Sequence, residues 1–281
     1  MRRFRILTTT FFISLLCANA FGQKTYPFEV QKTGKGEKAI IFIPGFASSG
    51  DVWDSTKDKL ENDFVCYTLT MAGFAGVKPQ TNSTFKSWEN AIAAYIKENK
   101  IEKPIIIGHS MGGGLALAIA SDYPKLIEKI IVVDALPSIS ALMNPDFKSQ
   151  ENVDCSAMVE QLTAMSDAQF FEMQTMSVPR LVENKEIQET IVEWSVKSDR
   201  TTFAEMYCDF SNTDLRQKIE NIECPALILL ESYFKNMKPI IEMQYQNLKG
   251  ADLRYADKGL HFIMFDDEEW YFNEINKFLI D

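Results

Sequence analysis

Residues 108–112 read Gly-His-Ser-Met-Gly and contain the side chain best suited to covalent chemistry, Ser110. A serine hydroxyl is a poor nucleophile at neutral pH, so it needs an imidazole to accept its proton and a third group to orient that imidazole. The motif directly follows an apolar run at 105–107 and opens an apolar helical pattern. Such a context predicts a sharp strand-to-helix turn that presents the serine. The alternative is a glycine-rich turn used only for close packing.

The histidine that would serve Ser110 can be sought by elimination, because the chain contains only two histidines, His109 and His261. His109 adjoins Ser110 on the turn, so its side chain is expected to point away from the hydroxyl. His261 is therefore predicted to be the catalytic base. The competing interpretation of His261 is a surface histidine without a catalytic role.

Two carboxylates end buried apolar runs and could orient His261. Asp134 follows the run 129–133, and Glu231 follows the run 226–230. A carboxylate in such a position is costly unless it has a partner, and His261 would be that partner. Asp134 is predicted to be the acid and Glu231 is the alternative. The non-catalytic interpretation of Asp134 is a turn residue, and that of Glu231 is an exposed charge at a strand end.

The elements that must position these residues alternate between strand and helix. Short runs rich in isoleucine, valine and leucine predict buried parallel strands. Helical patterns at 87–99 and 112–123 lie between them, which predicts an α/β fold with a mostly parallel central sheet and helices on both faces. The predicted strands are 39–43, 64–69, 105–107, 129–133, 226–230 and 252–255, with a possible edge strand at 26–30.

Residues 138–221 differ from the flanking sequence. They lack strand-like runs and consist of helical stretches rich in methionine and phenylalanine, so they predict a helical cap inserted between core segments 24–137 and 222–281. Additional surface helices of a single domain are the alternative. An apolar cap favours a substrate with a hydrophobic acyl or alcohol part, although such side chains are more often core than pocket. The apolar residues concerned are Met143, Phe147, Met158, Met165, Phe170, Phe171, Met173 and Met176.

Residues 1–23 have the layout of a secretory signal peptide. Arg2, Arg3 and Arg5 precede an apolar run at 11–16, which is too short for a membrane span, and Ala18-Asn19-Ala20 follows. The mature protein is therefore expected to be exported, to the periplasm or beyond. Removal of the signal peptide takes away its three arginines and changes the net charge of the chain from −10 to −13. This acidic charge argues against nucleic acid or anionic membranes as partners.

Four cysteines remain after cleavage, and they can pair in three ways. Cys155 and Cys208 are hypothesised to pair, because both lie in the predicted cap; Cys66 and Cys224 complete the set. The chain has no pair of Cys-x-x-Cys spacings, so no metal is predicted.

With the stretches FIPGFASSGDVWD, GHSMGG and GLHFIMFDDEEWYFNEINKFL, the sequence resembles the α/β-hydrolase superfamily, in its serine esterase-like branch with a helical cap. The resemblance implies the chain order nucleophile, acid, histidine. It also implies an oxyanion hole from the backbone N–H groups of Met111 and Phe46. Many relatives have His-Gly before the second donor, where this chain has Pro44-Gly45.

The position of the predicted acid differs from that in many members of the superfamily. In many relatives the acid follows the strand after the cap, and the corresponding position here falls near Phe234. Some branches instead carry it where Asp134 stands. Residues 262–265 are expected to form a loop leading into a helix whose first acids, 266–269, act as caps.

The combined prediction is a serine hydrolase that cleaves an ester or related acyl bond of a small, partly apolar substrate, without cofactor. The same residues could also catalyse other reactions, and the sequence does not choose among them: aminopeptidase, thioesterase, lactonase, C–C hydrolase and cofactor-free peroxidase reactions. A ligand-binding protein that has lost turnover is the alternative from another class. The oligomeric state is not indicated by the sequence.

Overall fold

The computed structural model describes residues 25–280, so the predicted signal peptide lies outside the described residues. A seven-stranded sheet forms the centre of the molecule, in the order β1-β3-β2-β4-β5-β6-β7. Only the edge strand β1 runs antiparallel to its neighbour, β3, and the other pairs are parallel. The strands are β1 Phe28–Gly34, β2 Lys38–Ile43, β3 Phe64–Met71, β4 Ile105–His109, β5 Lys129–Val133, β6 Ala226–Leu230 and β7 Asp252–Tyr255.

The central strands are apolar throughout because both faces of the sheet are covered. Successive side chains of a strand point to opposite faces. In β4, Ile106 belongs to the hydrophobic cluster on one face, while Ile105 and Ile107 belong to the cluster on the other. All three are almost fully buried. Because both faces of these strands are buried, their sequences are continuous runs of isoleucine and valine and do not alternate between apolar and polar residues.

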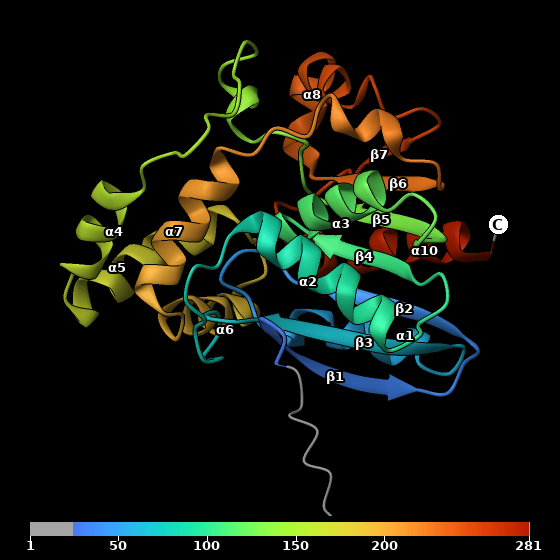
Figure 1. Cartoon of the computed structure of the whole chain (residues 1–281), viewed down its shortest axis with the longest axis horizontal. Coiled ribbons are helices and arrows are strands. Elements are labelled where there is room, and N and C mark those ends of the chain that lie inside the picture. Colours follow the sequence, from blue (N-terminus) through green and yellow to red (C-terminus); the bar gives the residue numbers. More distant parts are fainter. Residues whose placement is uncertain (1–24, 281) are drawn as a thin grey trace, which may run out of the picture.

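Helices cover the two faces in separate sets (Figure 1). The helices α2 Phe85–Glu98, α3 Met111–Asp122 and α8 Lys238–Tyr245 place buried side chains in the first cluster. The helices α1 Asp54–Leu60 and α10 Glu268–Ile280 place theirs in the second. The fold class predicted from the sequence is confirmed.

Between β5 and β6 the chain forms a helical segment, residues 138–221, that lies beyond one end of the strands (Figure 1). It contains α4 Ser156–Thr163, α5 Asp167–Ser177, α6 Lys185–Val196 and α7 Arg200–Ser211. A small cluster of its own, with Phe170, Leu162 and Ala204 buried, holds α4, α5 and α7 together.

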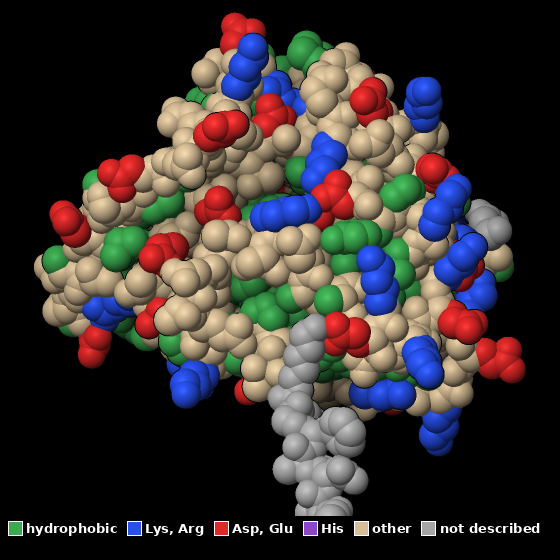
Figure 2. Space-filling view, in the orientation of Figure 1, with side chains coloured by type: hydrophobic (Ala, Val, Ile, Leu, Met, Phe, Trp, Pro, Cys, Tyr) green, Lys and Arg blue, Asp and Glu red, His purple; other side chains and the backbone are tan. Residues whose placement is uncertain are grey.

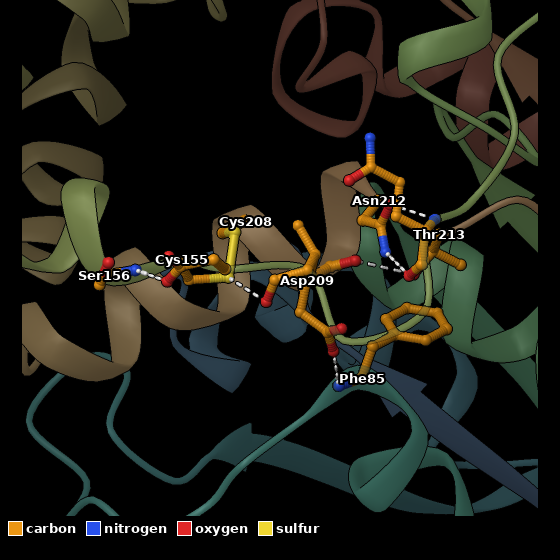
Figure 3. The surroundings of a disulfide bond; sticks show 10 residues. Phe85, Cys155, Ser156, Cys208, Asp209, Asn212 and Thr213 are labelled. Atoms are coloured by element: carbon orange, nitrogen blue, oxygen red, sulfur yellow. Dashed lines mark hydrogen bonds between the residues drawn. A yellow bond between two sulfur atoms is a disulfide. The ribbon is translucent and has the colours of Figure 1, made fainter.

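A disulfide between Cys155 and Cys208 ties the residue before α4 to α7, as hypothesised from the sequence (Figure 3). The next residue, Asp209, accepts a hydrogen bond from the Phe85 amide at the start of α2, with N···O 2.7 Å. One turn of α7 is therefore joined to the start of α4 by the disulfide and to α2 of the core by the Asp209 hydrogen bond. Cys66 and Cys224 are free thiols.

The helical stretch over residues 158–176 contains two helices, because Ser166 and Gln169 form a capping box that starts α5 after α4 has ended. One local expectation needs correction. Residues 263–266 are not a loop, since they form the short helix α9, Ile263–Asp266, before α10 begins. Glu268 and Glu269 do lie in the first turn of α10, where the helix dipole favours negative charge.

The surface shows no single-sign region over the face seen in Figure 2, where lysine, arginine and carboxylate side chains are interspersed. Several apolar residues of the helical segment are exposed rather than packed; Met143 is 86% and Met176 62% exposed. Within residues 25–280, every helix is too short or too polar to cross a lipid bilayer.

Candidate active site

The predicted site residues meet at the carboxyl ends of the parallel strands. The strand order reverses direction between β2 and β4, because β3 lies on one side of β2 and β4 on the other. Ligands of open α/β sheets bind in the crevice outside the strand ends at such a point. Gly45 and Phe46 follow β2 there, and Ser110 follows β4.

Ser110 is held in a strained turn between β4 and α3. Its backbone has φ 52° and ψ −122°, a region that residues with a Cβ rarely adopt. Its amide donates to the Val133 carbonyl, with N···O 2.8 Å, so the β5 edge fixes the strained residue. The hydroxyl forms no hydrogen bond within residues 25–280, and the side chain lines the pocket. Strain of this kind concentrates at functional sites.

The glycines of the motif allow the turn to pack against β2. A Cβ on Gly108 would lie 2.2 Å from the Gly112 carbonyl oxygen, and a Cβ on Gly112 would lie 2.3 Å from the Ile43 carbonyl oxygen. A Cβ on Gly45 would come within 3.2 Å of the Ser110 Cβ. The turn after β2 and the serine turn are therefore in direct contact.

Asp134 occupies the equivalent place one strand further along. Its amide donates to the Leu229 carbonyl, with N···O 2.7 Å, and its backbone also has a positive φ, 48°. The carboxylate is 1% exposed. Both oxygens are satisfied, because Oδ1 accepts from the Glu231 amide at 2.7 Å and Oδ2 from His261 Nδ1 at 2.6 Å. Charge-assisted bonds of this kind are what a buried carboxylate needs.

His261 is bound to Asp134 through Nδ1, which leaves Nε2 as the nitrogen that can accept a proton. Both its ring and Ser110 line one pocket. Desolvation by burial lowers the pKa of His261, but the hydrogen bond and charge of Asp134, with the charge of Glu231, outweigh it and raise the pKa above the usual 6.5. The pair thus favours the imidazolium form that proton abstraction would create.

His109 is the residue whose part the sequence did not reveal. Its ring is fully buried and its Nε2 lies 2.9 Å from the His261 carbonyl oxygen, to which it donates. The two imidazole rings are 4.6 Å apart. Burial and the neighbouring His261 hold the pKa of His109 well below its usual value, so it is neutral and donates from Nε2. The residue beside the serine therefore positions the backbone of the other histidine.

The two predicted oxyanion donors, Phe46 and Met111, flank Ser110. Within residues 25–280, neither amide donates to a backbone carbonyl. Met111 is the first residue of α3, where amides are unpaired and the helix dipole favours negative charge. The Phe46 ring packs on Phe74 and on Phe203 and Tyr207 of α7, with centroids 4.5–5.5 Å apart.

Glu231, the alternative acid, lies beside the Asp134–His261 pair without replacing it. Its amide bonds to Asp134, and its side chain lines the pocket, but no hydrogen bond joins its carboxylate to His261. Burial and the charge of Asp134 raise the pKa of Glu231 to about 7, against the lowering effect of His261. The geometry therefore favours Asp134 as the partner of the imidazole.

The pocket measures about 690 Å³, which suits a small organic molecule. The sheet edge supplies its floor, and the helical segment supplies most of its walls. Of the apolar residues that the sequence singled out, Met158 and Met173 line it, whereas Phe170 packs inside the helical segment. The remaining wall residues are mainly apolar: Leu136, Ile139, Leu142, Leu162, Leu181, Phe203, Phe210, Phe234 and Phe262.

Asp266 links the helical segment to the loop that carries His261. Its carboxylate accepts from the amides of Glu183 and Asn184, just before α6, and from the Leu260 amide, each with an N···O distance of 2.9 Å. The Phe262 amide also donates to the Leu181 carbonyl at 3.0 Å. Asp266 is thus a junction between two regions rather than a cap of α10.

Comparison with known proteins agrees with the fold. The family model described as alpha/beta hydrolase fold matches residues 38–159, which include β2, the serine turn and β5. The structure of the enol-lactonase from Burkholderia xenovorans LB400 superposes with a TM-score of 0.75 over 90% of this chain and 96% of that one, at 15% identity. That likeness concerns the fold. The chain has the α/β-hydrolase fold.

Curated proteins similar to this chain include two with long matches. N-formylmaleamate deformylase of Pseudomonas putida is 23% identical, over 88% of this chain and 90% of its own. Pimeloyl-[acyl-carrier protein] methyl ester esterase of Vibrio parahaemolyticus is 24% identical, over 71% of this chain and 76% of its own. Other relatives are 29% identical, but the match spans only 28–29% of their length.

Proposed function

We propose that this protein is an α/β hydrolase of the serine type, which cleaves an ester or related acyl bond through Ser110, His261 and Asp134. The observation that carries the proposal is the 2.6 Å hydrogen bond between His261 Nδ1 and the buried Asp134 carboxylate, at the same sheet edge as Ser110. Relatives described as a deformylase and a methyl ester esterase support acyl-bond hydrolysis. The helical segment, residues 138–221, would act as the cap that closes the pocket.

The reaction follows from the arrangement of groups. Ser110 Oγ attacks the acyl carbon while its proton passes to His261 Nε2, and Asp134 stabilises the resulting imidazolium. The Phe46 and Met111 amides hold the negative oxygen of the tetrahedral intermediate. His261 returns the proton to the leaving alcohol, which departs and leaves an acyl-Ser110. Water then attacks that ester while its proton passes to His261, and His261 returns the proton to Ser110 Oγ as the acyl–oxygen bond breaks, which releases the acid and free serine.

The test is covalent labelling with a fluorophosphonate, beside turnover of p-nitrophenyl esters of graded chain length and of amide and lactone substrates. Labelling and ester turnover are expected for the native protein, and both are lost in Ser110→Ala. The Ser121→Ala variant, changed at a buried serine of α3, controls for folding. A folded native protein that is neither labelled nor active would be a ligand-binding protein instead.

We also propose that the mature protein is exported. The basic, apolar and Ala-x-Ala pattern of residues 1–23 supports this, as does the Cys155–Cys208 disulfide, since disulfides persist in oxidising compartments. Cell fractionation with N-terminal sequencing of the mature chain tests it. A start at residue 1 in the cytoplasmic fraction would contradict it.

A further inference from the structure

The apolar wall of the pocket is interrupted by a polar corner, which we define as Gln174, Ser177 and Arg180. Gln174 and Ser177 lie three residues apart on α5, so they share a helix face, and Arg180 ends the short 3₁₀ helix that continues it, Val178–Arg180. All three line the same pocket as Ser110 and His261. The corner is therefore part of the surface that a bound substrate would meet.

Gln174 is the first sign that the corner is built for a ligand. The residue is only 7% exposed, yet within residues 25–280 its side-chain amide has no hydrogen-bond partner. The amide atoms themselves are not enclosed by protein, because the residue lines the pocket, so they are open to a ligand bound there. The amide NH₂ offers two donors toward the pocket.

Arg180 is the second sign, and the other arginines of the described chain provide the comparison. Arg200, Arg216 and Arg254 are each paired with an aspartate. Arg180 alone among these four forms no ion pair or hydrogen bond within residues 25–280, although the chain contains 39 acidic residues. The planar guanidinium presents a fork of donors that matches a carboxylate.

The backbone beside Arg180 is anchored to the catalytic loop. The Leu181 carbonyl accepts from the Phe262 amide, next to His261, so the corner lies at a set position relative to the imidazole. Of the arginine, aspartate and glutamate side chains of the pocket, the other one without an ion-pair partner within residues 25–280 is Glu231. Its ionised form repels an anionic group from the side near Asp134, and Arg180 would attract that group to the corner.

From these observations we infer that the corner is a receptor for a carboxylate on the acyl part of the substrate, distant from the bond that Ser110 attacks. The inference rests on the proposed function, because it assigns the other end of the acyl chain. Arg180 and the Gln174 amide would donate to the carboxylate. The Ser177 hydroxyl donates to the Met173 carbonyl at 2.8 Å, so it offers only an acceptor. The preferred substrates are then esters of dicarboxylic acids.

The experiment compares two esters of equal chain length, p-nitrophenyl pentanoate and mono-p-nitrophenyl glutarate, which differ by one carboxylate. The ratio of their kcat/KM values is the readout, so a general loss of activity cancels. The native protein is expected to favour the glutarate ester. Arg180→Met should lower that ratio by about 10- to 100-fold, the range of one charge-assisted hydrogen-bonded pair. Gln174→Leu should lower it less.

Lys185→Met is the matched control, because it removes one positive charge from an exposed side chain five residues away that does not line the pocket. It should leave the ratio unchanged. Two outcomes would contradict the carboxylate receptor. One is an equal preference of the native protein for both esters, and the other is an equal fall of the ratio in Arg180→Met and Lys185→Met.

The hydrolase activity and the carboxylate receptor can be tested separately. Turnover of the pentanoate ester without preference for the glutarate ester refutes the receptor and leaves the hydrolase intact. If neither ester is hydrolysed, the proposed function fails, and calorimetry with glutarate then decides the receptor alone. Glutarate binding to the native protein that is lost in Arg180→Met supports the receptor, and absence of binding refutes it.

Discussion

The two sides of the pocket are built by different means. At the sheet edge, the amides of Ser110 and Asp134 extend the hydrogen bonding of β4, β5 and β6, and strained backbone is held by fully buried strands. Across the pocket, the helical segment has a small core, a disulfide and several exposed apolar side chains. Under the proposed function, the sheet side positions the reacting groups, whereas the helical side selects which substrates reach them.

The largest loss of activity should come from the sheet edge. Asp134→Asn is expected to lower kcat by about 10³- to 10⁴-fold, because the amide no longer holds His261 in the productive tautomer or stabilises its charged form. Steady-state kinetics with a p-nitrophenyl ester measures this. Circular dichroism establishes that the variant is folded.

Glu231→Gln is the matched variant, and it is expected to keep most of the activity. Its effect should lie in the pH profile. The base form of His261 is required, so kcat/KM falls as pH drops through the pKa of His261. The charge of Glu231 contributes to the raised pKa of His261. Removing that charge therefore moves the acidic limb to lower pH. A severe loss in Glu231→Gln with an active Asp134→Asn would reverse the assignment.

A smaller effect is expected for His109, which acts through the backbone of His261. His109→Leu should lower kcat by about 10- to 100-fold with little change in KM, since small displacements of a catalytic group cost that much. His109→Gln should retain more, because its amide can donate to the same carbonyl. Equal activity of the Leu and Gln variants, at equal melting temperature, would show that the hydrogen bond has no positioning role.

Asp266 tests the junction between the two sides. Asp266→Ala removes the acceptor of three amides, two before α6 and one beside His261, so it should lower the free energy of unfolding by about 1–3 kcal/mol and kcat by about tenfold. Asp266→Asn, which keeps one acceptor oxygen, should lose less. Chemical denaturation and kinetics measure the two effects. The exposed Glu269→Ala is the control, and an equal response in both variants would remove Asp266 from this role.

The smallest effect on turnover should come from the disulfide. Replacing Cys155 and Cys208 by serine should cost about 2–4 kcal/mol in stability, concentrated in α4 and α7, while kcat for a short ester changes by less than about threefold. Hydrogen exchange of α4 amides reports the first and kinetics the second. Cys224→Ser, at a free thiol, is the control. A large fall in kcat would mean that the helical side also positions the reacting groups.

The sequence predicted the elements whose signal is local. The bounds of β5, β6 and β7 agree with the structure residue for residue, because each is a short run with clear flanks. His261 and Asp134 could be selected because few histidines and strand-end acids exist, and the structure brings these two into contact. Their catalytic roles stay predictions.

The remaining features depend on contacts between distant parts of the chain. The bond from His109 to the His261 carbonyl spans 152 residues, and no local pattern encodes it. Asp266 looks like an ordinary helix-start acid until the amides of Glu183 and Asn184 are seen beside it. Helical periodicity likewise could not tell Met173, which lines the pocket, from the exposed Met176.

The strained turn at Ser110 has a consequence for the stability of the chain. A glycine tolerates φ 52° without the penalty that a Cβ brings, so Ser110→Gly would relieve on the order of 1 kcal/mol of strain while removing the nucleophile. The greater flexibility of glycine in the unfolded chain would offset part of that gain. The backbone geometry at this position thus disfavours the very residue that the proposed reaction needs.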